Sequence, residues 1–332
     1  MCPTTYPPII GGLEFIAEMI AQSLGAAGHE VTVLTRQNGP QIPDRSYRLI
    51  RRPSLVQALR ICREAQVAVM PNIGLKVIPP VLLAGTPLVV WHQGELGAGT
   101  LRTKFKQILL RTRVSANLGC SDYITRLLPE NKPRATLSNP YDPSVMYEDA
   151  AVARDGDLLT VGRLVSDKGF DIVLKAMALA EGPLADARLT VVGHGPERER
   201  LEALAQSSGI ANRVSFVGAQ TGDTLRRTIN AHRVMIVPSV WEEPFGIVAL
   251  EGLACGCSMV VSAAGGLPEA VGPFGRTFRA GDPADAARAI AEARAAPRDP
   301  DPEGRKAHLA RHRSEAVATR LVELLTPYAT AP

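Results

Sequence analysis

The sequence lacks the features that would assign it to several large classes of protein. It contains no run of about 18 apolar residues, which a membrane-spanning helix would need, and no secretory signal. The net charge of +4 is too small to indicate nucleic-acid binding, although it suits an anionic substrate. The five cysteines are an odd number without disulfide-like spacing, which fits a reducing compartment. We therefore expect a cytoplasmic protein that binds no nucleic acid.

Familiar catalytic and cofactor motifs are missing as well. There is no P-loop and no nucleophile elbow, and no strand precedes a G-x-G-x-x-G sequence, which argues against a dinucleotide-dependent dehydrogenase. Two D-x-D strings begin at Asp155 and Asp299, but the first lies in a presumed linker and the second in a proline-rich loop. No other His, Cys or Asp cluster has metal-ligand spacing. The sequence predicts neither a metal nor another cofactor.

What is present indicates an α/β protein. At 332 residues, with 45% hydrophobic and 21% charged residues, the chain is long enough for two ordinary domains. Short apolar strands alternate with helices, which predicts parallel sheets that bind ligands beyond the carboxyl ends of their strands. The prolines of S-N-P-Y-D-P (138–143) and the acidic, small residues after them interrupt this pattern. We place the boundary there, with domains at 1–149 and 150–332.

One stretch, Val234 to Gly256, carries the strongest functional signal. An apolar strand, Val234 to Val237, is followed by a loop and then by a helix that we expect to have Pro244 in its first turn and Gly256 at its end. A strand, loop and helix in this order direct backbone N–H groups at an anion. Two carboxylates, Glu243 and Glu251, bracket the helix start. Taken singly, each could be an ordinary helical glutamate.

The sequence of this stretch, E-E-P-F-G-I-V-A-L-E-G-L-A-C-G, resembles the E-x7-E signature of retaining glycosyltransferases of family 4. The resemblance extends from Tyr6 to about Leu325. It implies the GT-B fold: two doubly wound, Rossmann-like domains with a donor site in the cleft between them. The domain at 1–149 would lie on the acceptor side, and the domain at 150–332 would bind the nucleotide-sugar, with a last helix that crosses back to the first domain. It also implies the transfer of a sugar, with retained configuration and without a metal, from a nucleoside-diphosphate sugar to an acceptor.

The donor-binding residues follow from matching motifs. In L-T-V-G-R-L-V-S-D-K-G, Gly162 marks a turn, and Arg163 and Lys168 match the family residues that bind the donor diphosphate. Arginine offers a planar fork and lysine a mobile point charge, although an ordinary solvated loop also uses both. The helix start after Glu243 adds a second anion-binding group, whose members are Phe245, Gly246 and Ile247.

Two glycine loops complete the predicted donor site. Gly11 and Gly12 follow Y-P-P-I-I, where a glycine pair lets the backbone approach a phosphate or an acceptor closely. Gly195 belongs to G-H-G-P-E, a weaker signal because lone G-x-G patterns are common. The family has a longer strand before the first of these loops, so the first strand here is short or its beginning lies outside the sequence.

Three side chains receive roles on the reacting sugar and the ribose. W-H-Q-G-E resembles the family segment whose histidine faces the donor sugar, which makes His92 a catalytic candidate. Because carboxylates accept hydrogen bonds from vicinal hydroxyls, Glu251 is assigned to the ribose and Glu243 to the sugar. Glu243 is either a nucleophile or a group that positions the sugar for attack on the leaving-group face, and we favour the second.

The segment Leu101 to Val114 is basic and amphipathic, with Arg102, Lys104, Lys106, Arg111 and Arg113. One interpretation is a weak contact with an anionic membrane surface, which would place the protein at the inner face of a membrane. The other, which we favour, is a solvated helix whose apolar residues pack on the sheet.

Two alternative functions remain open. A sugar-nucleotide epimerase or hydrolase shares the fold and needs no acceptor. A non-catalytic, glycosyltransferase-like partner subunit would keep the fold without the reaction, although the set of Arg163, Lys168, Glu243 and Glu251 argues against it. The sequence does not identify the donor base, the donor sugar, the oligomeric state or the acceptor, which could be a saccharide, a lipid-linked compound or a small metabolite.

Overall fold

The computed structural model describes residues 1–4, 6–7, 12–40, 45–97, 99–179 and 184–330. The chain divides into two compact units, each described separately below. Unit 1 comprises Met1–Pro140 and Arg311–Pro332, and unit 2 comprises Tyr141–Ala310. The predicted boundary at residue 149 stays a prediction.

Unit 2 contains a six-stranded, fully parallel sheet in the order β12-β11-β10-β7-β8-β9. Because β7 is the first of these strands along the chain, the connections reverse direction between β7 and β10, at the centre of the sheet. The strands are β7 (Gly156–Val161), β8 (Leu189–Val192), β9 (Val214–Gly218), β10 (His232–Val237), β11 (Ser258–Ser262) and β12 (Gly275–Phe278).

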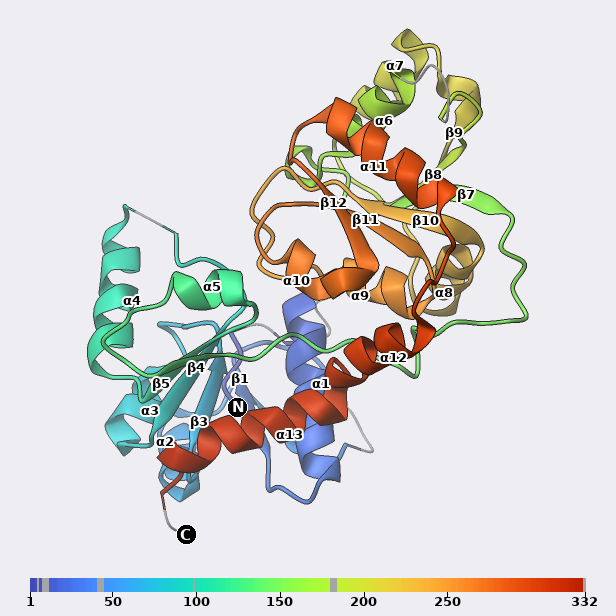
Figure 1. The fold of residues 1–332 in the computed structure, drawn as a ribbon. Coiled ribbons are helices and arrows are strands. Elements are labelled where there is room, and N and C mark those ends of the chain that lie inside the picture. The colour runs from blue at the N-terminus through green and yellow to red at the C-terminus, as the bar shows by residue number, and fades with distance from the viewer. Residues whose placement is uncertain (5, 8–11, 41–44, 98, 180–183, 331–332) are drawn as a thin grey trace. The chain divides into compact units, whose positions relative to one another are not determined.

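Helices cover both faces of this sheet, as in other doubly wound folds (Figure 1). Helices α6 and α11 pack together on one face with α7 beside α6, and α8, α9 and α10 cover the other. The helices are α6 (Phe170–Ala178), α7 (Arg198–Ser207), α8 (Gly222–Asn230), α9 (Ile247–Ala254), α10 (Leu267–Val271), α11 (Pro283–Ala295) and α12 (Pro302–Arg311). The core is aliphatic and includes Val173, Met177, Ile236 and Ile290.

Unit 1 contains a four-stranded parallel sheet, β3-β4-β5-β6, and a separate parallel pair, β1-β2. The first two residues connect the two: Met1 O accepts a hydrogen bond from Leu34 N in β1, and Cys2 N donates to Val69 O in β3. This short segment lies where the family places a full strand. The strands are β1 (Thr32–Thr35), β2 (Arg48–Arg51), β3 (Ala68–Pro71), β4 (Leu88–His92), β5 (Ala116–Gly119) and β6 (Arg134–Thr136).

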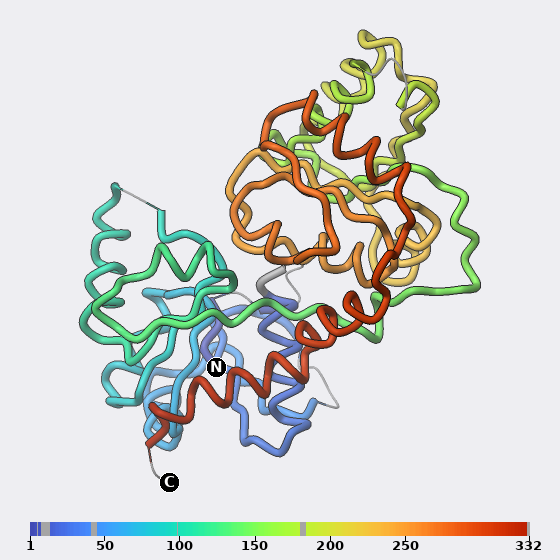
Figure 2. Tube along the Cα trace, in the orientation of Figure 1, coloured from blue at the N-terminus to red at the C-terminus, as the bar shows by residue number. Residues whose placement is uncertain are grey.

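The helices of unit 1 come from both ends of the chain. The last long helix, α13 (Ser314–Leu325), packs against the first, α1 (Gly12–Ala26), in the ribbon and in the chain trace (Figures 1 and 2). The other helices of the unit are α2 (Leu55–Glu64), α3 (Pro79–Ala84), α4 (Leu101–Thr112) and α5 (Asp122–Arg126).

The alternation of strands and helices predicted from the sequence is confirmed, but two details are wrong. Pro244 does not lie in the first turn of α9, which begins at Ile247, because Gly246 has φ +100° and interrupts the helical path. The apolar residues of α4 do not all pack on the sheet. Leu109 and Leu110 are buried, whereas the exposed fractions of Leu101, Phe105 and Ile108 are 85%, 52% and 57%.

Candidate functional site

The candidate site of unit 2 lies where the strand order reverses, at the carboxyl ends of β7 and β10. Open parallel sheets bind ligands at this point, because the connections leaving two neighbouring strands diverge to opposite faces. The loop after β7 carries Arg163 and Lys168, and the loop after β10 carries Ser239 and Glu243. Fold topology alone therefore brings the predicted diphosphate-binding loop beside the predicted sugar-binding loop.

An ion pair joins these two loops. Lys168 Nζ contacts Glu243 Oε1 although the residues are 75 positions apart. Ser239 Oγ donates to the same carboxylate oxygen at 2.7 Å, and Ser239 itself is fully buried. Glu243 is 8% exposed, so its charge is compensated by a cation and a hydroxyl rather than by bulk water. The sequence placed Lys168 and Glu243 on different parts of the donor and did not predict their pairing.

The main chain of Glu243 is also fixed. Its carbonyl oxygen accepts a hydrogen bond from Gly266 N at 2.7 Å. Gly265 has φ +60°, a conformation that favours glycine. A Cβ at this position would also lie 2.2 Å from the Glu243 carbonyl oxygen, so both the backbone conformation and the available space require glycine. The glycine pair after β11 thus packs directly on the backbone of Glu243 and sets the position of its side chain.

The other predicted glycine loop has a structural explanation. A Cβ on Gly195 would lie 2.2 Å from Leu164 O, and one on Gly193 would lie 1.9 Å from Gly162 O. Leu164 N donates to His194 O at 3.0 Å, which ties the two loops together. Packing of one loop on the other therefore accounts for the glycines, and the predicted contacts of Gly162 and Gly195 with a donor stay predictions.

Helix α9 begins with open N–H groups next to this site. Its first residue, Ile247, follows Gly246, and no side chain caps the helix start. Ala249 N donates to Gly246 O at 3.0 Å, so the N–H groups of Ile247 and Val248, before it, form the positive end of the helix that attracts an anion. Phe245 is 2% exposed, so its ring fills the core and only its backbone could contact a ligand.

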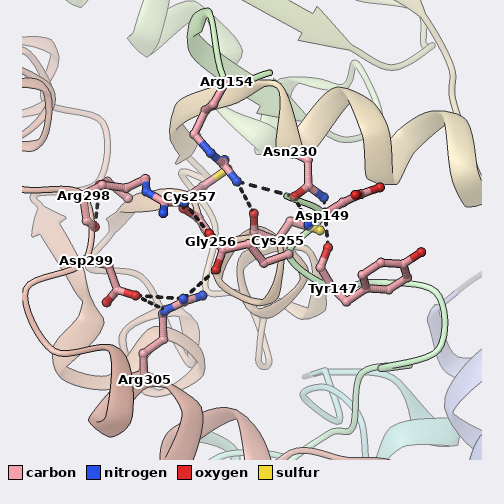
Figure 3. A network of polar contacts seen from close by, with 12 residues as sticks. Tyr147, Asp149, Arg154, Asn230, Cys255, Gly256, Cys257, Arg298, Asp299 and Arg305 are labelled. Carbon is pink, nitrogen blue, oxygen red and sulfur yellow. Dashed lines mark hydrogen bonds and ion pairs between the residues drawn. The ribbon is translucent and has the colours of Figure 1, made fainter. Parts of the chain in front are cut away.

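The opposite end of α9 is capped by three arginines (Figure 3). Arg154 donates to Cys255 O at 2.8 Å, Arg305 to Leu253 O at 3.1 Å and Arg298 to Gly256 O at 3.3 Å. These cations compensate the negative end of the helix, where carbonyl groups lack N–H partners. None of the three arginines was predicted, because Arg154 and Arg298 lie in loops and Arg305 on a polar helix, where arginines are usually solvated.

Two of these arginines, Arg298 and Arg305, also hold the segment that precedes β7. Glu148 forms ion pairs with Arg298 and Arg305. Burial alone would raise the pKa of Glu148, but the hydrogen bonds from these guanidinium groups lower it below its ordinary value. Glu148 therefore stays charged and holds the start of unit 2 against its last helix.

The remaining donor-binding candidates of unit 2 differ in environment. Arg163 is exposed, and no hydrogen bond or ion pair of its side chain is found within the described ranges. Glu251 is partly buried in α9, and burial raises the pKa of its carboxyl group to about 7. Asp167, next to Lys168, has a buried Oδ1 atom that accepts no hydrogen bond from any residue that the structure describes. Sequence reasoning did not select Asp167, because no motif marks it.

In unit 1, His92 ends β4 and contacts the neighbouring strand. His92 Nε2 lies 3.0 Å from Asn117 Oδ1 in β5, and both side chains are buried. Burial lowers the pKa of His92 to about 4, so the imidazole is neutral at physiological pH. The amide nitrogens Asn117 Nδ2 and Gln93 Nε2 are buried without acceptors in the described part of the chain. Of the predicted glycine pair, Gly11 lies outside the described residues and Gly12 begins α1.

Comparison with known proteins agrees with this geometry. Residues 149–306 match the family model described as Glycosyl transferases group 1. The matched range lies within unit 2. The matched range includes every residue of the cluster at the ends of β7 and β10, from Arg163 to Glu251.

Two curated relatives share part of the chain. An uncharacterized glycosyltransferase, MJ1607 of Methanocaldococcus jannaschii, is 42% identical over 115 residues, or 34% of this chain and 29% of the relative. A D-inositol 3-phosphate glycosyltransferase of a Mycobacterium species is 42% identical over 117 residues, or 33% of this chain and 25% of the relative. The aligned stretches thus span less than a third of the length of these relatives.

Solved glycosyltransferase structures share the whole fold. The Anabaena protein HepE in complex with UDP superposes with a TM-score of 0.77 over 98% of both chains, at 17% identity. At such low identity the likeness concerns the fold alone. It confirms the predicted fold class, GT-B with two Rossmann-like domains.

The described residues form neither a metal-ligand cluster nor a membrane-spanning helix. Across the described part of the chain, no three His, Cys, Asp or Glu side chains come together as a metal site would need. Among the helices that the structure describes, none is long and apolar enough to cross a membrane.

Proposed function

We propose that the protein is a retaining glycosyltransferase of family 4, which moves a sugar from a nucleoside-diphosphate sugar to an acceptor. The observation that carries the proposal is the Lys168–Glu243 pair at the centre of the unit 2 sheet, inside the glycosyltransferase group 1 domain. A cation and a carboxylate held side by side are suited to a substrate that combines a diphosphate with a polyol.

The diphosphate is stabilised by positive groups around it. Arg163 has no competing carboxylate in the part of the chain that the structure describes, so its guanidinium fork is available to a phosphate. The uncapped N–H groups of α9 supply a second, fixed source of positive potential. Lys168 supplies a third as it turns from Glu243 toward the incoming anion. These groups lower the barrier to departure of the nucleoside diphosphate.

Glu243 then positions the sugar. Once Lys168 turns to the diphosphate, the Glu243 carboxylate is left with Ser239 as its partner and accepts hydrogen bonds from sugar hydroxyls. In this mechanism the acceptor attacks on the face that the leaving group vacates, which retains the anomeric configuration. Neutral His92 orients the sugar, and Glu251 binds the ribose.

The names of similar proteins suggest the first substrates to test. The HepE structure contains UDP, so UDP-sugars are the first donors to try. The Mycobacterium relative is named for D-inositol 3-phosphate, so phosphorylated polyols are a reasonable acceptor class.

The test is thermal unfolding of the purified protein against UDP, GDP, ADP and their sugars, with and without EDTA. A ligand at about 100 times its dissociation constant adds roughly 2.7 kcal/mol of stability, which is readily measured. We expect one base to raise the unfolding midpoint whether or not EDTA is present. Arg163→Ala should abolish the shift, whereas Arg200→Ala, an exposed arginine on α7, should keep it.

The outcomes separate the alternative functions. If no nucleotide stabilises the protein, the non-catalytic partner subunit becomes the better interpretation. If a nucleotide-sugar binds and is consumed without any acceptor, the protein is a hydrolase or an epimerase. An EDTA-sensitive shift would overturn metal independence. Cytoplasmic location and a weak contact of α4 with a membrane surface stay predictions.

A further inference from the structure

Unit 1 contains a cavity that the proposed reaction does not use. Its volume is about 340 Å³, within the usual size range of small-molecule sites. The lining residues are Cys2, Leu34, Thr35, Arg36, Pro53, Leu55, Ala58, Lys76, Val77, Pro79 and Pro80.

The cavity lies at the carboxyl edge of the unit 1 sheet. Thr35 ends β1, Pro53 follows the end of β2, and Lys76 belongs to the connection between β3 and α3. Arg52 has φ +47°, unusual for a residue other than glycine, and its N–H donates to Thr35 O at 2.7 Å. This turn reverses the chain after β2 and brings Pro53 and Leu55 to the cavity.

The interior and the rim of the cavity differ in chemistry. Buried Cys2, Leu34 and Ala58 make the interior apolar. The rim carries two exposed cations, Arg36 and Lys76, and none of the described residues that line the cavity is a carboxylate. Within the described ranges, neither cation has a hydrogen bond or an ion pair from its side chain. The cavity therefore combines an apolar interior with uncompensated positive charge at its opening.

Two further polar features favour a negative ligand. The hydroxyl of Thr35 accepts a hydrogen bond from Gln37 N at 3.1 Å, which leaves its own proton available as a donor. Leu55 is the first residue of α2, so the positive end of a ten-residue helix is also at the opening. Among the described lining residues, Arg36, Lys76 and the Thr35 hydroxyl proton can all interact favourably with an anion.

We propose that this cavity binds an amphipathic anion, with an apolar body in the interior and a carboxylate or phosphate group paired with Arg36 and Lys76. The cavity is defined by residues of unit 1 that were given no role in the proposed glycosyl transfer, and its test measures binding directly rather than turnover. The two head groups share one recognition chemistry, and the phosphate, with more charge, binds more tightly.

The test uses four compounds with the same eight-carbon chain below their micelle concentrations: octyl phosphate, octanoate, octanol and octyltrimethylammonium. Isothermal titration calorimetry with the full chain should show octyl phosphate binding about tenfold more tightly than octanol, since two partly exposed charge contacts are worth about 1.4 kcal/mol together. Octanoate should fall between these two, and the ammonium compound should bind most weakly. Equal binding of the phosphate and the ammonium compound would overturn the proposal.

Matched variants locate the site. Arg36→Gln with Lys76→Gln should remove the preference for octyl phosphate over octanol. Arg60→Gln with Lys104→Gln removes two exposed unit 1 cations that do not line the cavity, and should leave the preference intact. Leu55 is 58% exposed, so Leu55→Asp should fold normally while weakening every octyl compound. A preference that survives in the first variant, or is lost in the second, contradicts the assignment.

Cys2 supplies a local reporter. The hydrogen bond from Cys62 lowers the pKa of Cys2 to about 7, so its thiolate reacts with a small methanethiosulfonate reagent that enters the cavity. Octyl phosphate should slow modification of Cys2 at least several-fold at saturation, without changing the rate at Cys120, which is buried elsewhere. If both rates change together, the compound loosens the protein as a whole, and the proposal fails.

Discussion

The carboxyl ends of the strands in the two units differ in how their polar and charged side chains are paired. In unit 2 the edge is charged and internally paired: Lys168 contacts Glu243, and glycine loops hold the backbone of Glu243. In unit 1 the edge has a neutral, buried pair, His92 and Asn117, and uncompensated cations at a cavity. The unit 2 edge pairs Lys168 with Glu243 before a ligand arrives and leaves Arg163 without a side-chain partner among the described residues, whereas the unit 1 edge leaves Arg36 and Lys76 without one.

In unit 2 the backbone determines the geometry of the ligand site, whereas in unit 1 exchangeable side chains determine it. In unit 2 a glycine is required wherever one loop crosses another, as at Gly265 beneath Glu243 O. The main chain therefore fixes where the Glu243 carboxylate lies. In unit 1 the cavity depends on Arg36, Lys76 and the turn at Arg52, which can be exchanged without disturbing a strand. We therefore expect unit 2 to recognise a common ligand class and unit 1 a specific one.

The largest expected effect comes from removing the negative charge of Glu243, the partner of Lys168 in unit 2. Glu243→Gln keeps the shape of the side chain but removes the charge that holds Lys168 and binds the sugar. We expect turnover to fall about 100- to 1,000-fold, the size typical for loss of one preorganised electrostatic group. Steady-state kinetics with the donor identified by thermal unfolding measures this. Glu242→Gln, an exposed neighbour, is the matched control and should lose less than about threefold. A normal turnover for Glu243→Gln would remove it from the reaction.

The next effect concerns the neutral pair of unit 1. In His92→Ala we expect turnover to fall about 10- to 100-fold while donor affinity changes less, because an unpaired polar group costs about 1–3 kcal/mol. The pKa of His92 is about 4, so the wild-type turnover profile should show no step from this residue between pH 5 and 8. Unchanged turnover in the variant would exclude the catalytic assignment.

The same pKa predicts how stability depends on pH. Between about pH 6.5 and 4 the unfolded chain binds a proton at His92 and the folded protein does not, so the free energy of unfolding falls as the pH is lowered through this window. His92→Ala should lack that part of the decline in denaturant titrations. A decline of the same size in both proteins would mean that His92 is charged when folded.

The smallest expected effect concerns Glu251. Burial raises the pKa of its carboxyl group to about 7, so the charged carboxylate destabilises the protein when no ligand is bound. Between about pH 4.5 and 7 the folded protein holds a proton that the unfolded chain releases, so stability falls as the pH rises through this window. Glu251→Gln should therefore equal wild type below pH 4.5 and exceed it above pH 7 by about 1–3 kcal/mol, after allowance for partial solvent contact. The same variant should bind the donor more weakly.

A matched carboxylate controls this experiment. Glu199 is exposed on α7, and Glu199→Gln should change neither stability nor donor binding. If Glu251→Gln is more stable but binds the donor normally, Glu251 does not contact the ribose. If it is not more stable at high pH, the carboxyl group is better solvated than its burial implies.

Local sequence signals predicted the elements of the unit 2 site well. The apolar run before Pro238 predicted β10, and the alternation of strands and helices predicted the parallel sheet. The start of α9 was misplaced, because Pro244 is compatible with a first helical turn and the sequence does not show that Gly246 adopts a positive φ. Helix α2 was not predicted, although Ser54 and Gln57 have capping-box spacing at its start and the Ser54 side chain accepts a hydrogen bond from Gln57 N.

Contacts between distant residues could not be predicted in the same way. The Lys168–Glu243 pair and the three arginines at the end of α9 depend on which loops the topology brings together. The exposed stripe of α4 was missed for a related reason: an amphipathic pattern shows that one face is apolar, but not whether another element covers it. The cavity of unit 1 has no motif at all.

The packing of α13 on α1 has a consequence for the order of folding. Unit 1 contains the first 140 residues and the last 22, so it is interrupted by all of unit 2. A ribosome releases the chain from its N-terminus, and Tyr141–Ala310 is therefore complete before Ser314 emerges. Until then the face of α1 that α13 covers stays bare. Unit 2 begins later in the sequence than unit 1, but all of its residues are synthesised before unit 1 is complete.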